Sequence, residues 1–400
     1  MAIKLALKDE CRLVPVRFER ASKSEPDIQF PDIDNRGYRN KDASIDGVSV
    51  VSNQHTALLS LSAGQSATIK LVRENIAPTA PLFVSSSNSD CLSVISPTEN
   101  AKCADGPFSL IKIEAQLLET NKTQVATLEV RFGRADGPII HRLDVYVLPK
   151  LIIKIQPFLV TINGENGASG KAVRLNLSKV FSIASAIWGN AGIQLSFAKP
   201  ISLSASLRQA DKMSCNSHLN EMNRVLDLKW EADRVNLYIM QEVEGGMSIT
   251  VNAQDYRYLK LIRPGIFFGL HSCEQNQARP EEQVTNRASD AHLCGNDLAH
   301  ELGHFFALPH SGAFTNHDSP QPEDTWSMRS IMHETNTIVR NVPNGASVAD
   351  FNDLSYGFKN EEHAYRGALV PIKRIGANGN DASCDMARKY IAKGIKHLYS

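Results

Sequence analysis

The sequence predicts an all-β part followed by an α+β part, and three observations lead to this prediction. Short runs with strand character recur between residues 46 and 150. From residue 151 onward, strands are interspersed with a segment of helical periodicity, and a second helical segment near residue 300 carries several histidines. Side chains repeat every two residues along a strand and about every 3.6 along a helix, so these patterns separate the two parts.

The segment 46–150 has the texture of a β-sandwich. The preceding residues, 1–45, are polar and broken by Pro and Asp, which predicts an irregular arm. About seven short strands in roughly a hundred residues favour an immunoglobulin-like sandwich. The clearest of these strands lie at 68–72, 110–113, 126–130 and 143–147. Such a module serves as a spacer or as a binding appendage, and the sequence identifies no ligand for it.

The segment after residue 151 mixes strands and helices. The predicted strands lie at 152–160, 193–197, 235–240 and 265–270. A helix is predicted between the first two, ending at Gly189-Asn190, with one apolar face. That face comprises Leu177, Val180, Phe181, Ala184, Ile187 and Trp188. Further on, a helix is predicted to begin at 360–362, and an amphipathic helix is predicted at 383–398, in a C-terminal tail, 371–400.

One run in the chain has strong chemical meaning. It reads His300-Glu301-Leu302-Gly303-His304-Phe305-Phe306-Ala307-Leu308-Pro309-His310. Residues four apart share one helix face, so His300 and His304 can reach one zinc ion, with Glu301 beside its open position. His310 can join only if the chain turns back after the helix. Three unrelated histidines of a core helix are the alternative, although His-Glu-x-x-His arises by chance in only about 2% of such chains.

These residues resemble the signature of the metzincin clan of zinc metallopeptidases, H-E-x-x-H-x-x-G-x-x-H followed by a Met-turn. Ser330-Ile331-Met332-His333 has the form of that turn, with Met332 as the apolar floor beneath the metal. The resemblance covers 151–370. It implies an α+β metzincin-like catalytic domain with a twisted mixed sheet and an active-site helix. It also implies one catalytic Zn²⁺ held by His300, His304 and His310.

Two positions depart from the family pattern. Ala307 replaces the glycine that lets the chain turn between the second and third ligands, and a left-handed residue other than glycine costs about 1 kcal/mol or more. Glu334 stands where some metzincins have a tyrosine that assists the transition state. Ala307 affects the fine geometry of the turn between the second and third ligands, and Glu334 means that the tyrosine electrophile is missing. Neither change alters the predicted set of zinc ligands.

The predicted reaction is hydrolysis of a peptide bond. Glu301 acts as general base on a zinc-activated water and then passes the proton to the leaving amine. The resemblance also implies that an edge strand holds a protein or peptide substrate in extended form, by main-chain hydrogen bonds. The candidate strand comprises Ile266, Phe267, Phe268, Gly269 and Leu270.

Two other functions stay open. In one, the protein binds metal and a partner but has lost turnover, an alternative that Ala307 raises. In the other, a gluzincin-like peptidase uses a downstream glutamate, such as Glu334 or Glu361, in place of His310. His317 and Asp318 could hold a second ion, although a solvated loop pair is the favoured interpretation.

Composition adds limits on partners and compartment. With 43 basic and 43 acidic residues the chain has no electrostatic footprint for nucleic acid, and no apolar run has the length of a membrane span. The N-terminus lacks the long apolar stretch of a secretory signal, which is compatible with a cytoplasmic protein, with export by another route, or with a leader already removed. We expect a secreted or exported protein, with a cytoplasmic protein as the alternative. Of the seven cysteines, Cys91 with Cys103 and Cys273 with Cys294 could form disulfides or stay free thiols. The oligomeric state is not predicted.

Overall fold

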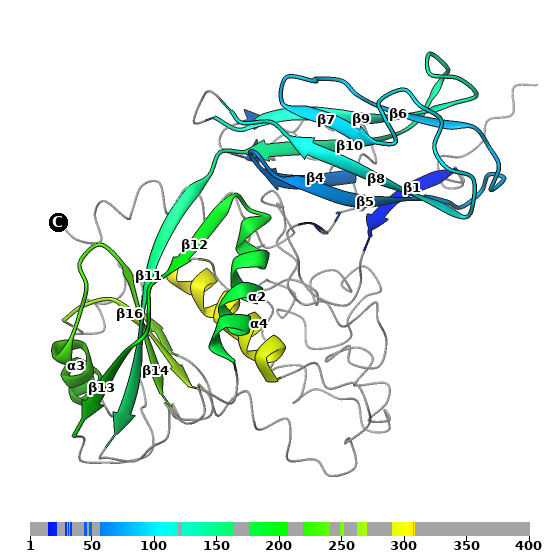
Figure 1. Cartoon of the computed structure of the whole chain (residues 1–400). Helices are drawn as coiled ribbons and strands as arrows, with labels where there is room; N and C mark the ends of the chain where they lie inside the picture. Colours follow the sequence, from blue (N-terminus) through cyan, green and yellow to red (C-terminus); the bar gives the residue numbers. More distant parts are fainter. Residues whose placement is uncertain are drawn as a thin grey trace, which may run out of the picture. The chain divides into compact units, whose positions relative to one another are not determined.

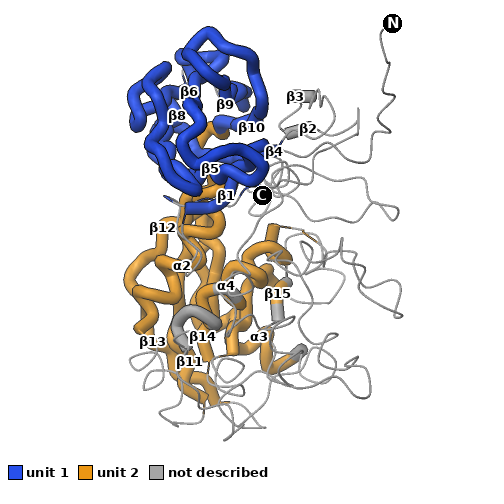
Figure 2. The backbone as a smooth tube through the Cα atoms, turned by 90° about the vertical axis from the view of Figure 1, so that its right-hand side faces the viewer, with its two compact units in different colours: residues 1–21, 29–39, 52–147 blue, residues 22–28, 40–51, 148–400 orange. Residues whose placement is uncertain are grey.

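The computed structural model describes about half of the chain. The described residues are 15–21, 29, 31, 33, 44–45, 48–49, 57–118, 122–162, 176–206, 219–240, 249–251, 262–269, 290–306 and 308. The chain divides into two compact units, coloured separately in Figure 2. Unit 1 comprises Met1–Ala21, Gln29–Arg39 and Ser52–Val147, and unit 2 comprises Ser22–Ile28, Asn40–Val51 and Leu148–Ser400.

Unit 1 contains two four-stranded sheets (Figure 1). The first has the order β1-β5-β8-β7 and the second the order β4-β10-β9-β6. The strands are β1 (Val16–Arg20), β4 (Ala57–Ser62), β5 (Ser66–Arg73), β6 (Leu82–Ser86), β7 (Leu92–Ser96), β8 (Phe108–Ala115), β9 (Gln124–Phe132) and β10 (Ile139–Leu148). β1 lies within the stretch for which an irregular arm was predicted, so five residues of that stretch form a strand instead.

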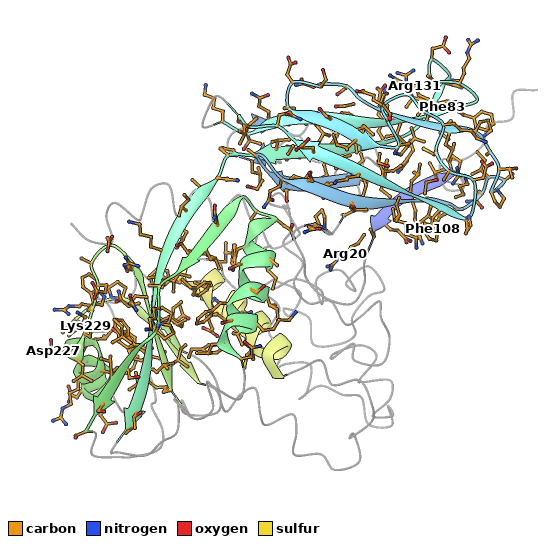
Figure 3. The ribbon with its side chains drawn as sticks, viewed as in Figure 1. Arg20, Phe83, Phe108, Arg131, Asp227 and Lys229 are labelled. Carbon is orange, nitrogen blue, oxygen red and sulfur yellow. The ribbon has the colours of Figure 1, made fainter. Side chains whose placement is uncertain are left out.

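The core of unit 1 lies between these two sheets, where side chains fill the space (Figure 3). Buried and exposed residues alternate along β8, so Ile111 and Ile113 face inward while Phe108 and Leu110 face outward. Phe108 is covered in part by Lys70, whose Nζ lies 4.6 Å from the ring centroid. Along β8, the period of two in the sequence thus gives one apolar face toward the core and one exposed face.

Unit 2 contains a six-stranded sheet of order β12-β11-β14-β16-β15, with β13 also pairing with β11. Its strands are β11 (Leu151–Ile162), β12 (Ile193–Phe197), β13 (Ile201–Ala205), β14 (Val235–Met240), β15 (Ile249–Val251) and β16 (Gly265–Gly269). The pairings are parallel except that of β15 with β16. Every residue of β14 and β16 is buried, as expected for strands covered on both faces. Ser44–Ile45 (β2) and Val48–Ser49 (β3) form a separate pair.

The helices described in this unit are α2 (Leu177–Gly189), α3 (Leu219–Leu228) and α4 (Asp290–Phe305), and they flank the sheet. α3 packs Met222, Val225 and Leu226 against the sheet face that carries Tyr238 and Phe267. α2 and α4 pack together on the opposite side (Figure 1). Among the described residues, no helix combines the length and the apolar character needed to cross a membrane.

The predicted fold class is wrong. Sixteen strands and three helices occur among the described residues, which makes this part of the protein predominantly β, with three larger sheets. These residues do not show the expected fold class, which was an α+β metzincin-like catalytic domain preceded by an immunoglobulin-like sandwich. The physical reason is that a histidine signature constrains one helix and the turn after it, and says little about the sheet that surrounds them.

Candidate functional site

The signature histidines lie on helix α4, whose two sides differ in burial. Residues on one side are fully buried, and they are Leu298, Ala299, Leu302 and Phe305, followed by Phe306 just past the helix. His300, Glu301 and His304 are half-buried and lie on the other side. Apolar packing thus fixes the helix, while the polar groups stay accessible for chemistry.

Helix α2 holds α4 through a close approach of the two backbones. A Cβ atom added at Gly295 would lie 2.6 Å from Ile183 Cβ and 3.1 Å from the Val180 carbonyl oxygen. The indole Nε1 of Trp188 donates a buried hydrogen bond of 3.1 Å to the Ala299 carbonyl. The same indole meets the Phe306 ring edge-on, with 4.9 Å between centroids. These contacts set the position of the helix that carries His300 and Glu301.

The structure brings the first two signature histidines together. The Nε2 atoms of His300 and His304 lie 3.0 Å apart, and the two ring planes are perpendicular. The spacing of four residues places both rings on the same helix face, as the sequence predicted. Two ring nitrogens therefore converge on one point beside α4.

The turn after α4 orients His304. Leu308 N–H donates to the Gly303 carbonyl at 2.9 Å, a bond across five residues that is typical of helix C-terminal turns. The Leu308 carbonyl then lies 2.9 Å from His304 Nδ1. A carbonyl oxygen only accepts, so Nδ1 carries the hydrogen, and Nε2 of the neutral ring keeps its lone pair on the side of His300. This is the tautomer that a metal ligand needs.

The spacing of the two nitrogens fits a zinc ion. Zinc–nitrogen bonds of about 2.0–2.1 Å in tetrahedral geometry place two ligand nitrogens about 3.3 Å apart. The observed separation of 3.0 Å differs from this by a few tenths of an ångström. Among the described residues, no group of three potential ligands is found, and His310 lies outside these residues. Met332, Glu334 and Glu361 also lie outside them, as do His317 and Asp318.

Glu301 is engaged by a residue that the sequence did not point to. Thr250 Oγ1 donates to Glu301 Oε2 at 2.5 Å and lies 3.3 Å from the Glu301 carbonyl oxygen. Thr250 is the middle residue of β15, a strand of three residues. A strand of three residues is too short to show the alternation of apolar and polar residues that identifies a strand in a sequence, so this contact is seen only in the tertiary structure.

The candidate substrate strand is not an edge strand along most of its length. β16 lies between β14 and β15, and β15 pairs with Gly265, Ile266 and Phe267. The side chains of Ile266, Phe267 and Phe268 are at most 1% exposed and cannot contact a substrate in solvent. Gly269 is buried too, and Leu270 lies outside the described residues. Within the described part of this sheet, β15 is the outermost strand on that side.

The cysteines divide into two kinds. Cys91 and Cys103 are buried free thiols, so the disulfide considered between them is not formed. Burial raises the pKa of Cys103 to about 11, which keeps it a protonated, unreactive thiol. Cys294, in α4, is disulfide-bonded, and its partner lies outside the described residues.

Comparison with known proteins gives neither a family nor a function for this chain. No protein-family model and no curated protein matches the chain. A structure described as WR4, a C. elegans MSP family member, has 14% identity and a TM-score of 0.18, covering 23% of this chain and 91% of that one. A Bacteroides ovatus GH5 xyloglucanase in complex with a XXXG heptasaccharide has 10% identity and a TM-score of 0.20, covering 85% and 98%. Both TM-scores are too low to support a fold or a function.

Proposed function

We propose that this protein is a zinc-dependent endopeptidase in which His300, His304 and His310 hold one catalytic Zn²⁺ and Glu301 is the general base. The observation that carries the proposal is the convergence of His300 and His304, whose Nε2 atoms lie 3.0 Å apart. The signature resembles that of the metzincin clan, with Ala307 at the position of the clan's glycine and Met332 in its Met-turn.

Each residue of the proposed site has a distinct role in peptide hydrolysis. When bound, zinc supplies Lewis acidity, which polarises a peptide carbonyl and lowers the pKa of water toward about 7. Glu301 takes a proton from the attacking water, whose oxygen bonds to the carbonyl carbon. As the C–N bond breaks, Glu301 returns that proton to the leaving amine. The Leu308 carbonyl keeps His304 in the ligating tautomer throughout.

The proposed substrate is a protein or peptide bound in extended form. β15, rather than β16, is the strand that we assign to this role, because it is the outermost described strand and its Thr250 contacts Glu301. Main-chain groups on the outer side of such a strand can pair with a substrate backbone. The balanced charge of the chain gives no reason to propose nucleic acid as a ligand.

We propose that the protein acts in an oxidising compartment outside the cytoplasm, with a cytoplasmic protein as the alternative. The disulfide of Cys294 supports this proposal, because structural disulfides persist in oxidising surroundings. Mass spectrometry of the protein isolated from its source, with free thiols alkylated beforehand, tests it. A reduced and alkylated Cys294 would contradict export.

Zinc content tests the metal site and its third ligand. Purified wild type should hold one zinc per chain, and His304→Ala and His310→Ala should each lose most of it. His292→Ala is the matched control, because His292 lies in the same helix outside the signature. If His310→Ala retains zinc while Glu334→Ala or Glu361→Ala loses it, the gluzincin-like alternative is right.

Cleavage tests the activity. Wild type should cleave a denatured protein such as casein, and Glu301→Ala should keep zinc but not cleave. Zinc bound by a wild type that cleaves nothing would favour the alternative of a metal-binding interaction protein.

A further inference from the structure

Thr250 stands out because it contacts the proposed general base from a different element of the fold. β15 is separated from the signature by some fifty residues of sequence, yet Thr250 Oγ1 lies 2.5 Å from Glu301 Oε2. The hydroxyl has only one hydrogen to give, and the carboxylate oxygen is the nearer of its two acceptors. The contact is therefore a charge-assisted hydrogen bond between a strand and a helix.

The position of the Thr250 hydroxyl is fixed by the sheet. Thr250 pairs with Ile266 of β16, a fully buried strand that in turn pairs with β14. Threonine has a branched Cβ, so its side chain has few rotamers. The donor is thus held by a rigid element, whereas Glu301 has three side-chain torsions and is only half-buried. A rigid donor of this kind restricts the carboxylate to one orientation.

We infer that Thr250 is the positioning residue of the proposed general base: its hydroxyl holds Glu301 Oε2 and so sets the orientation in which the carboxylate takes the proton from water. The inference rests on the proposed function. Thr250 does not touch substrate or metal in this role and acts only through Glu301. Threonine and valine have nearly the same shape and both favour strands, so valine at position 250 would keep the strand and remove only the hydroxyl.

The test uses full-length, zinc-loaded protein and fluorescein-labelled denatured casein as substrate. Thr250→Val removes the hydroxyl and preserves shape, and Thr250→Ser restores a hydroxyl without the methyl group. Thr250→Ala completes the set, since it differs from Thr250→Ser by the hydroxyl alone. The matched control is Thr127→Val in β9, where Thr127 Oγ1 donates to Asp144 Oδ1 at 2.7 Å.

A misplaced catalytic group costs up to about 100-fold in rate, so we expect kcat of Thr250→Val to fall by about 10- to 100-fold. KM and zinc content should stay within about twofold of wild type, because neither substrate nor metal is bound by this hydroxyl. Thr250→Ser should recover most of kcat and Thr250→Ala should not. Thr127→Val should have the wild-type kcat.

Three results would overturn the inference. The first is a kcat of Thr250→Val within about twofold of wild type. The second is an equal loss in Thr250→Ser and Thr250→Ala, which would assign the effect to packing. The third is loss of zinc from Thr250→Val, which would make the contact structural. Glu301→Ala separates this inference from the proposed function. If the Glu301→Ala protein still cleaves, the proposed function itself fails. If Glu301→Ala is inactive while Thr250→Val is fully active, only the role of Thr250 fails.

Discussion

Replacing Gly295 with alanine should destabilise unit 2, because α2 lies close to α4 at this residue. The added Cβ would lie 2.6 Å from Ile183 Cβ and 2.7 Å from Ile183 Cγ2. Carbon atoms in contact lie about 3.5–4.0 Å apart, so the two helices must separate by about 1 Å. The obstructing Cβ is attached directly to the backbone of α2, and no side-chain rotation can move it away.

The expected cost follows from two opposing effects. Overpacking that cannot be relieved by a rotamer change costs about 3 kcal/mol, the upper end of the usual range. Alanine is the better helix former by about 1 kcal/mol, which offsets part of this. The free energy of unfolding should therefore fall by about 2 kcal/mol, which lowers Tm by about 4–8 °C for a unit of this size.

Tryptophan fluorescence measures this change in unit 2 alone, since Trp188, Trp230 and Trp326 all belong to that unit. The comparison variant is Gly265→Ala in β16, where the added Cβ would lie 3.2 Å from Tyr238 Cε2 and 3.4 Å from Leu226 Cδ2. These atoms are the ends of side chains and can move by a few tenths of an ångström, so this variant should lose less stability. A Gly295→Ala protein as stable as wild type would refute the described packing of α2 on α4.

Two further predictions concern buried polar groups. Trp188→Phe removes the hydrogen-bond donor to the Ala299 carbonyl and should lower the free energy of unfolding by about 1–3 kcal/mol. Urea titrations followed by circular dichroism measure this change. An unchanged urea midpoint would contradict the buried hydrogen bond. His141 stacks on Phe18, and burial lowers the pKa of the histidine. Folding therefore disfavours the charged form of His141. Unit 1 should lose stability as the pH falls through the unfolded-state pKa of about 6.5. His141→Phe should remove this pH dependence between about pH 7 and 5, and a dependence equal to that of wild type would exclude His141 as its source.

Local patterns in the sequence predicted individual elements well. The strand expected at 110–113 lies inside β8, and the helix expected from Leu177 is α2, which ends at Gly189. Both depend on periodicity and on a terminating residue, which are properties of neighbouring residues along the chain. The same holds for the spacing of His300 and His304, which needs only one helix turn to bring the rings together.

Properties that depend on distant residues were not predicted. The metzincin-like class was inferred from the signature, and the described residues do not show it. The sequence Gly265-Ile266-Phe267-Phe268-Gly269 is a continuous apolar run, which is typical of a strand buried on both faces and argues against an edge strand. Helix α3 was missed, although Leu219, Met222, Val225 and Leu226 repeat at helical spacing. The contact of Thr250 with Glu301 had no local signal.

The most direct test of the proposed zinc site compares cleavage by wild type and by Glu301→Ala at equal measured zinc content. His300 and His304 are unchanged in this variant, so both proteins should hold one zinc per chain. Wild type should release peptides from denatured casein, and Glu301→Ala should be slower by at least about 100-fold, the usual contribution of a general base. Equal rates in the two proteins, or a wild type without zinc, would contradict the assignment of His300, Glu301 and His304 as a hydrolytic metal centre.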